Sequence, residues 1–345
     1  PSKNLDTFFT DEKTTVQLFL DKRADGDFAV LEGVMGLYDG LGGIYEQGSS
    51  YHLAKVTQTP IILVVDAKGM GKSVLALIAG FLQYDTQHLI KGVLLNRMSK
   101  GYYDIIKPLI EKELSVKVVG YFPEQKDIRL ESRHLGLVMP DELADIKEQL
   151  DELAGRLKKT IDLDMLLDIA VEAEEISDSG NADIYNVKNI GNYDQNEFSQ
   201  NKAINTVNIA VAMDEAFCFY YEDNLRLLEK CGAKLQYFSP LHDTKLPDNC
   251  DALLLGGGYP ELYAKELSEN LSMRNSIKTA FKTGLPTVAE CGGFMYLHTY
   301  IHNICEEDAD AQNYVFGMTG ALDSECHFKG KLVRFGYIEL AEKHN

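Results

Sequence analysis

Residues 285–297 read LPTVAECGGFMYL: a short apolar run ends at Cys291, and two glycines and a second apolar segment follow. This order predicts a buried strand, a tight turn and a helix. Open α/β sheets place functional groups at the carboxyl ends of their strands. A helix that begins there favours the thiolate form of a cysteine through its dipole. The pattern therefore favours a nucleophilic Cys291, with a small buried cysteine as the alternative.

A second glycine-rich turn lies upstream at residues 253–261 (LLLGGGYPE), where another strand-like run ends in three glycines. Backbone N–H groups in such a turn could hold an anion or a developing oxyanion. Taken alone, an ordinary tight turn between a strand and a helix explains this segment better. The sequence around it predicts helices at 222–231 and 264–283, and strands at 207–212, 235–238, 252–255 and 286–289.

The N-terminal half alternates in the same way, with predicted helices at 74–84 and 103–114 and predicted strands at 27–34, 60–66, 92–96 and 118–121. Apolar strands separated by helices are typical of a parallel sheet that is covered on both faces. An amphipathic helical pattern follows at 143–161. We expect two doubly wound α/β domains, at residues 1–180 and 206–345, with a polar linker at 181–205.

The composition excludes several classes of protein. The 345 residues include 34 Lys and Arg against 53 Asp and Glu, a formal net charge of −19. Such a chain repels nucleic acid and anionic membrane surfaces, so we expect neither as a partner. We find no apolar run long enough to span a bilayer and no N-terminal signal segment. The six cysteines form no CxxC pair, which suits reduced thiols and a cytoplasmic location.

The two glycine-rich turns together resemble the triad-type class I glutamine amidotransferase domain, in the branch fused to cobyrinic and cobyric acid synthases. Residues 31–40 (LEGVMGLYDG) look like a signature of the cobyrinic acid a,c-diamide synthase family. Further segments are similar to that family in the same order, namely residues 1–6 (PSKNLD), 131–137 (ESRHLGL) and 334–337 (RFGY). The last differs in spacing, because Gly336 follows Arg334 after a single residue. The resemblance covers nearly the whole chain.

This resemblance implies a flavodoxin-like glutamine amidotransferase domain in the C-terminal half and a P-loop NTPase-like, dethiobiotin-synthetase-like amidoligase domain in the N-terminal half. Cys291 would attack the glutamine amide, and the backbone of Gly257, Gly258 and Gly292 would form the oxyanion site. ATP and Mg²⁺ are the implied cofactors. Glutamine and a tetrapyrrole polycarboxylate are the implied substrates. A homodimer is a further possibility that the resemblance leaves undecided.

The implied reaction is ATP-dependent amidation of the a and c carboxylates of cobyrinic acid. Two alternatives stay open: amidation of another tetrapyrrole, such as nickel sirohydrochlorin, or a non-catalytic relative. Glu32 and Asp39 flank a glycine-rich loop after a predicted strand, and two such carboxylates can hold Mg²⁺ near phosphate oxygens. Solvated loop acids are the alternative. Asp6, Arg133 and His134 are the candidates for contact with nucleotide or substrate.

Residues 66–73 (DAKGMGKS) nearly match a phosphate-binding loop. Asp66 stands where that motif requires glycine, and its carboxylate would repel phosphates. We therefore interpret this segment as a decoy. The resemblance places the family's phosphate loop upstream of residues 1–6 and its triad histidine downstream of 334–337. We expect both to lie outside this chain.

Overall fold

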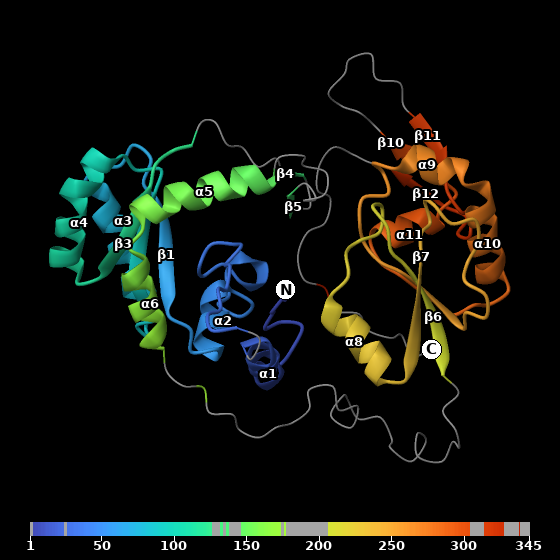
Figure 1. Ribbon diagram of the computed structural model, residues 1–345, viewed down its shortest axis with the longest axis horizontal. Helices are drawn as coiled ribbons and strands as arrows, with labels where there is room; N and C mark the ends of the chain where they lie inside the picture. The colour runs from blue at the N-terminus through green and yellow to red at the C-terminus, as the bar shows by residue number, and fades with distance from the viewer. Residues whose placement is uncertain are drawn as a thin grey trace. The chain divides into compact units, whose positions relative to one another are not determined.

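The computed structural model describes residues 3–23, 26–125, 132–133, 136–137, 146–173, 176, 206–303, 314–327 and 338. The chain forms two compact units, one of Leu5–Asn181 and the other of Ala182–Asn345 with Pro1–Asn4 (Figure 1). Each unit is an α/β structure built on a parallel sheet, so the predicted fold class is confirmed.

The N-terminal unit contains a parallel sheet in the order β1-β2-β3, formed by Ile61–Asp66, Ile90–Asn96 and Lys117–Phe122. Helices α3 (Ser73–Tyr84) and α4 (Lys100–Leu114) connect consecutive strands. These five elements confirm the predicted strand–helix alternation to within a few residues. Two parallel strands need such a crossover helix, because the chain must return to the end of the sheet where the first strand began.

Helices cover both faces of this sheet. One face, with Leu63, Val93 and Val118, belongs to a core cluster that includes Ile78 of α3 and Ile110 of α4. On the other face lie α5 (Ile146–Thr160), within the predicted amphipathic segment, and α6 (Leu163–Val171). The buried Ile169 of α6 comes so near Gly92 that a Cβ there would lie 3.2 Å from its Cδ1. The doubly wound arrangement is therefore confirmed for this unit.

The remaining elements of this unit are α1 (Glu12–Arg23), η1 (Leu41–Gly43), α2 (Ser50–Val56), β4 (Ser132–Arg133) and β5 (Gly136–Leu137). The strand predicted at 27–34 is wrong, because residues 26–34 have no regular structure. Val30 and Val34 are 80% and 83% exposed. A strand exists only when its backbone bonds to a neighbour, and among the described strands β1 pairs with β2 alone.

The C-terminal unit contains a parallel sheet in the order β7-β6-β8-β9. Its strands are β6 (Val207–Ala212), β7 (Ala233–Phe238), β8 (Ala252–Leu255) and β9 (Thr287–Ala289), all close to their predicted bounds. Helix α8 (Glu222–Lys230) packs against β7. The inner residues of β6 and β8 pack with α10 (Leu271–Lys282) and α11 (Gly292–Leu297) in one apolar core.

Two features of this unit differ from the predictions. The helix predicted at 264–283 is two helices, α9 (Ala264–Glu269) and α10, because Asn270 interrupts it. The Asn270 side chain accepts a hydrogen bond from Met273 N and donates to the carbonyls of Pro240 and Asp243. A small unpredicted sheet follows, in the order β11-β10-β12, formed by Tyr314–Gly317, Tyr300–Asn303 and Glu325–His327.

Asp85, at the end of α3, is the most connected buried carboxyl group of the N-terminal sheet. It is 3% exposed. One carboxyl oxygen accepts hydrogen bonds from Tyr51 Oη (2.9 Å) and Leu89 N (2.9 Å), and the other accepts from Ile90 N (2.7 Å). Removing such a group leaves three buried donors without an acceptor, and each unsatisfied donor destabilises the fold.

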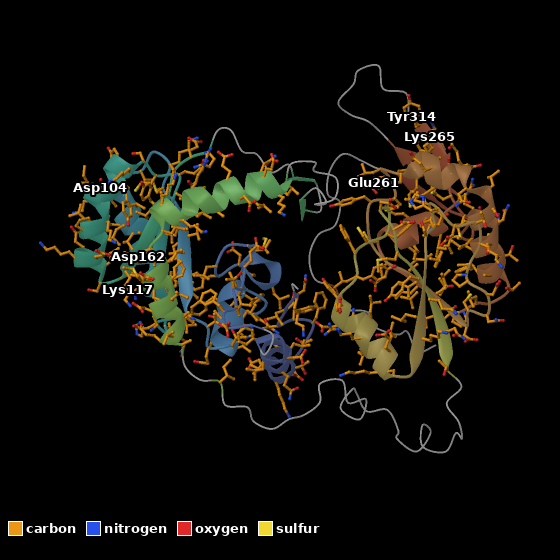
Figure 2. The ribbon with its side chains drawn as sticks, viewed as in Figure 1. Asp104, Lys117, Asp162, Glu261, Lys265 and Tyr314 are labelled. Carbon is orange, nitrogen blue, oxygen red and sulfur yellow. The ribbon has the colours of Figure 1, made fainter. Side chains whose placement is uncertain are left out.

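Asp85→Ala is therefore expected to lower the free energy of unfolding by about 3 kcal/mol, measured by urea denaturation. The matched control is Asp104→Ala (Figure 2), because Asp104 lies exposed on α4 and pairs only with Lys100 among the described residues. That control should cost less than about 1 kcal/mol. Equal losses in the two variants would contradict the role of Asp85.

Candidate active site

The candidate site lies where the strand order of the C-terminal sheet reverses. The chain passes from β6 to β7 on one side and then crosses to β8 on the other side of β6. Open parallel sheets form a crevice for ligands at the carboxyl ends of the two strands flanking such a reversal. Here β6 leads into residues 213–220, and β8 leads into the glycine-rich turn at 256–258.

Cys291 has a strained backbone. Its φ of 48° and ψ of −113° are unusual for a residue with a side chain. The turn around it is held by backbone hydrogen bonds from Glu290 N to Leu255 O (3.0 Å) and from Gly293 N to Gly256 O (2.9 Å). A sharp turn between a strand and a helix presents its central side chain to solvent, and Cys291 is exposed.

The glycines of the two turns are required by close contact. A Cβ on Gly293 would lie 2.2 Å from Leu255 O, and one on Gly292 would lie 2.7 Å from Pro260 Cδ. Gly258 has a φ of 154°, and a Cβ there would lie 2.1 Å from the carbonyl oxygen of Ala216. A side chain at Gly292 or Gly293 would push the Cys291 turn away from the end of β8 and the glycine loop, and one at Gly258 would push that loop away from Ala216.

The same contact places backbone donors beside the cysteine. The position that a Cβ would take on Gly257 lies 3.5 Å from Cys291 Cβ. Gly257 O accepts a hydrogen bond from Phe219 N (3.1 Å). Among the described residues, the N–H groups of Gly258 and Gly292 donate to no hydrogen-bond acceptor. Free N–H groups near a nucleophile are what an oxyanion site needs.

Tyr220 supports the first glycine of the turn. Its hydroxyl group accepts a hydrogen bond from Gly256 N (2.7 Å) and donates one to Ala212 O at the end of β6. Burial raises the pKa of Tyr220, so the phenol stays neutral and can fill both roles. A Cβ on Gly256 would lie 2.4 Å from the Tyr220 ring. The ring and the turn therefore fix each other's position.

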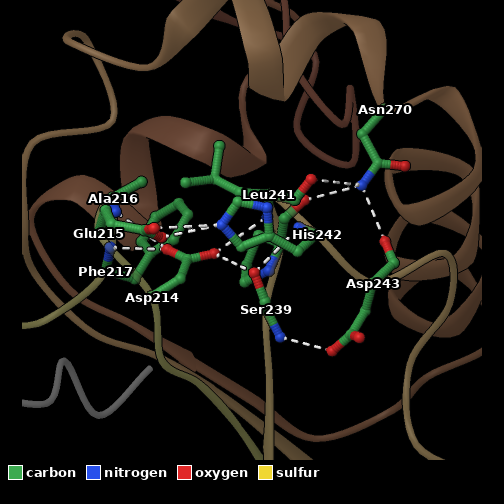
Figure 3. Close-up of polar contacts among 10 residues, drawn as sticks. Asp214, Glu215, Ala216, Phe217, Ser239, Leu241, His242, Asp243 and Asn270 are labelled. Carbon is green, nitrogen blue, oxygen red and sulfur yellow. Dashed lines mark hydrogen bonds and ion pairs between the residues drawn. The ribbon is translucent and has the colours of Figure 1, made fainter.

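Asp214, just after β6, joins the loops at the ends of β6 and β7 (Figure 3). One carboxylate oxygen accepts from Ala216 N (2.9 Å) and Phe217 N (3.1 Å). The other accepts from Ser239 Oγ (2.8 Å) and Leu241 N (2.9 Å). This fixes the carbonyl of Ala216, which accepts from Tyr259 N (3.1 Å). Asp214 thus stabilises the loop at residues 214–217, whose Ala216 carbonyl contacts the segment just after the glycine turn.

The structure therefore brings together four of the predicted residues: Cys291, Gly257, Gly258 and Gly292. Their catalytic roles stay predictions. Sequence reasoning missed Asp214 and Tyr220. The available signal was that two acidic residues (Asp214 and Glu215) and then two tyrosines (Tyr220 and Tyr221) follow the predicted strand at 207–212, at the end of the sheet where sites form.

Histidine is not hydrogen-bonded to Cys291 in the part of the chain that the structure describes. His298, at the end of α11, is buried, and its Nδ1 contacts the carbonyl oxygen of Phe294 (2.8 Å). The imidazole ring also packs edge-on against the Phe294 ring. These contacts give His298 a structural role, because it is the residue at which α11 ends.

Glu32 and Asp39 lie exposed on a loop of the N-terminal unit, which follows unstructured residues and not the predicted strand. The loop is anchored by Tyr38, whose hydroxyl group donates to Phe81 O (2.8 Å). The Asp39 carboxylate lies over Gly36, where a Cβ would be 2.1 Å from Oδ2. Carboxylates suit Mg²⁺, but Glu32 and Asp39 belong to no group of three or more His, Cys, Asp and Glu ligands among the described residues. Their role in holding Mg²⁺ stays a prediction.

The other three predicted contact residues are only partly described. Asp6 accepts a hydrogen bond from Phe8 N (2.7 Å), and its carbonyl accepts from Thr10 N (3.2 Å), so it shapes the turn before α1. Arg133 is part of β4, which pairs with β5; its side chain and the whole of His134 lie outside the described residues. A role for the three in nucleotide or substrate binding stays a prediction.

The segment 66–73 leads from β1 into α3, but its charges are already paired. Arg97 forms a bidentate ion pair with Asp66, and this contact lowers the pKa of the Asp66 carboxyl group. Lys72 pairs with Glu113 of α4 (3.1 Å). The negative charge that sequence analysis placed in the loop thus serves to join the ends of β1 and β2.

Comparison with known proteins assigns the C-terminal unit and its site to a class of glutamine amidotransferase domain. A family model of the CobB/CobQ-like glutamine amidotransferase domain matches residues 208–345, which contain the Cys291 turn and the glycine loop. Curated relatives match almost the whole chain. Cobyrinate a,c-diamide synthase of Caldanaerobacter subterraneus subsp. tengcongensis is 39% identical over 98% of this chain and 69% of its own length.

The same-named proteins of Clostridium tetani and Listeria innocua serovar 6a are 38% and 37% identical. Their matches cover 99% and 97% of this chain, and 70% and 69% of their own lengths. The chain belongs to the cobyrinate a,c-diamide synthase family. The predicted resemblance is confirmed. For membrane association, no helix among the described residues is long and apolar enough to cross a bilayer.

Tyr220→Phe is expected to lower kcat for glutamine hydrolysis about tenfold, because Gly256 N loses its acceptor and the glycine turn loses its tie to β6. Steady-state kinetics would measure kcat and KM separately. The control is Tyr237→Phe, on the neighbouring strand β7 and 54% exposed. An unchanged kcat in Tyr220→Phe, with a thermal midpoint equal to that of the control, would show that the hydroxyl group does not position the turn.

Proposed function

We propose that this protein amidates the a and c carboxylates of cobyrinic acid, using ATP and ammonia released from glutamine. The observation that carries the proposal is the strained turn at Cys291 packed against the glycine loop. Membership of the cobyrinate a,c-diamide synthase family supports the choice of substrate. A binding protein without catalysis would have no need for a strained, exposed cysteine beside unpaired N–H groups.

In the proposed glutaminase step, Cys291 Sγ attacks the side-chain amide carbon of glutamine. The carbonyl π electrons move to oxygen, and the N–H groups of Gly258 and Gly292 donate to the oxyanion. The absence of a side chain on Gly257 leaves room for the substrate carbon. Ammonia leaves after gaining a proton, and a thioester forms. Water then hydrolyses the thioester to glutamate and the free thiol.

In the proposed ligase step, which we assign to the N-terminal unit, ATP phosphorylates a substrate carboxylate. Ammonia attacks the activated carbonyl carbon, and phosphate leaves as the amide forms. Asp6, Arg133 and His134 are proposed to contact nucleotide or substrate. Glu32 and Asp39 are proposed to hold Mg²⁺, which when bound would neutralise phosphate charge. The net charge of −19 makes such neutralisation more important.

Cys291→Ala is expected to abolish glutamine-dependent amidation in the native-length protein, because no other group supplies the nucleophile. Ammonium salt should restore amidation, since the ligase step uses ammonia itself. Product would be measured by mass spectrometry with cobyrinic acid, ATP and either nitrogen source. Cys231→Ala, also at an exposed cysteine, is the control and should behave as wild type. Glutamine-dependent turnover in Cys291→Ala would contradict the assignment.

Lys72→Ala is expected to change the Kd for ATP by less than about twofold in the native-length protein, because Lys72 is 71% exposed and its surface ion pair contributes little. Isothermal titration calorimetry would measure the Kd. The matched control is Lys100→Ala, since Lys100 is 72% exposed and pairs with Asp104. A tenfold or greater loss in Lys72→Ala alone would make residues 69–73 the nucleotide site.

A further inference from the structure

We propose that His302, Glu325 and His327 form a binding site for a divalent transition-metal ion such as Zn²⁺. His302 lies on β10, and Glu325 and His327 lie on β12, so all three belong to the small sheet β11-β10-β12. None of them is part of the Cys291 turn. Within the described residues they are the one group of three or more His, Cys, Asp and Glu side chains with ligand atoms all within 4.8 Å of one another.

The strand register explains why the three groups meet. Strands β10 and β12 are parallel, with Tyr300 opposite Glu325, Ile301 opposite Cys326 and His302 opposite His327. Side chains alternate between the two faces of a strand. Ile301 is fully buried, and Cys326 packs against the same apolar core. The residues on either side of them, including all three proposed ligands, must therefore share the outer face.

The distances are close to those of a metal centre. His302 Nε2 lies 2.8 Å from Glu325 Oε2, and His327 Nε2 lies 3.7 Å from the same oxygen. In a tetrahedral zinc site with bonds of about 2.0–2.1 Å, neighbouring ligand atoms are about 3.3 Å apart. The two measured separations lie on either side of that value. The two imidazole rings stack with centroids 4.2 Å apart, so metal binding requires the rings to turn until a nitrogen lone pair of each points at one ion.

The ligand set indicates which ions fit. Two imidazoles and one carboxylate suit ions of borderline softness, Zn²⁺ above all, and Mg²⁺ prefers oxygen ligands alone. Glu325 and His327 are exposed, so water can complete the coordination and the ion can enter without opening the core. A bound ion would join the short strand β12 to β10, which adds a stabilising link to the sheet.

A second His–Glu pair of this chain, His242 and Glu215, differs from the proposed site in the number of ligands. His242 Nε2 lies 3.0 Å from Glu215 Oε2, much like the His302–Glu325 pair, and it is also exposed. That pair has no third ligand among the described residues within reach. Two ligands bind a divalent ion far more weakly than three, so the His242–Glu215 pair is a natural control.

The experiment titrates Zn²⁺ into chelator-treated, tag-free, native-length protein by isothermal titration calorimetry, with Co²⁺ absorption as a second probe of coordination geometry. The variants are His302→Gln, His327→Gln and the near-isosteric Glu325→Gln, with His242→Gln as the control. Each of the first three should weaken Zn²⁺ binding at the site at least about tenfold, and should remove the Zn²⁺-dependent rise in Tm. The control should change neither.

The near-isosteric Glu325→Gln variant keeps the test decisive if a histidine variant fails to fold, because Glu325 is exposed and its amide analogue preserves shape. Wild-type Zn²⁺ affinity and Tm response in Glu325→Gln and in each folded histidine variant would overturn the proposal. So would an equal loss in His242→Gln, which would indicate unspecific surface binding. Glutaminase activity is not a readout, so failure here leaves the proposed function untouched.

Discussion

Two glycine-rich turns approach each other so closely that side chains would separate them, and the exposed position of Cys291 depends on that contact. Backbone strain at a non-glycine residue with positive φ costs on the order of 1–3 kcal/mol. The bonds from Glu290 N to Leu255 O and from Gly293 N to Gly256 O act on the same turn, and each contributes about 1 kcal/mol. The strain therefore persists because backbone hydrogen bonds to the end of β8 hold the turn.

The support continues outward in a second layer of polar contacts. Tyr220 ties Gly256 to the end of β6, and Asp214 fixes the loop whose carbonyl accepts from Tyr259. Both residues follow β6, the strand at which the sheet order reverses. A reversal leaves no adjoining crossover to cover the strand ends, so side chains must supply the contacts that hold the loops. This explains why the neutral Tyr220 and the Asp214 carboxylate, which accepts four hydrogen bonds, both lie in the loop after β6.

Sequence alone predicted most of the strands and the tight turn at Cys291, because both are local patterns. The apolar runs at 207–212 and 252–255 became β6 and β8 with the same bounds. The failures have non-local causes. Asn270 divides a helical pattern because its side chain bonds carbonyls about thirty residues earlier. Residues 27–34 have strand composition but no described partner strand. Tyr220 and Asp214 were missed because the partners that give them their roles, Gly256 for Tyr220 and Ser239 and Leu241 for Asp214, lie far along the chain.

The proposed glutaminase step has two requirements, oxyanion stabilisation and proton transfer. The proposed oxyanion stabilisation depends on backbone geometry, because it uses the N–H groups of Gly258 and Gly292. Proton transfer needs a titratable group near Cys291 Sγ. Among the described residues no histidine is hydrogen-bonded to Cys291, and His298 Nδ1 contacts the Phe294 carbonyl oxygen. An oxyanion site without a nearby base still stabilises the transition state electrostatically. For the proposed glutaminase step, the described residues therefore provide the exposed thiol of Cys291 and the backbone donors beside it.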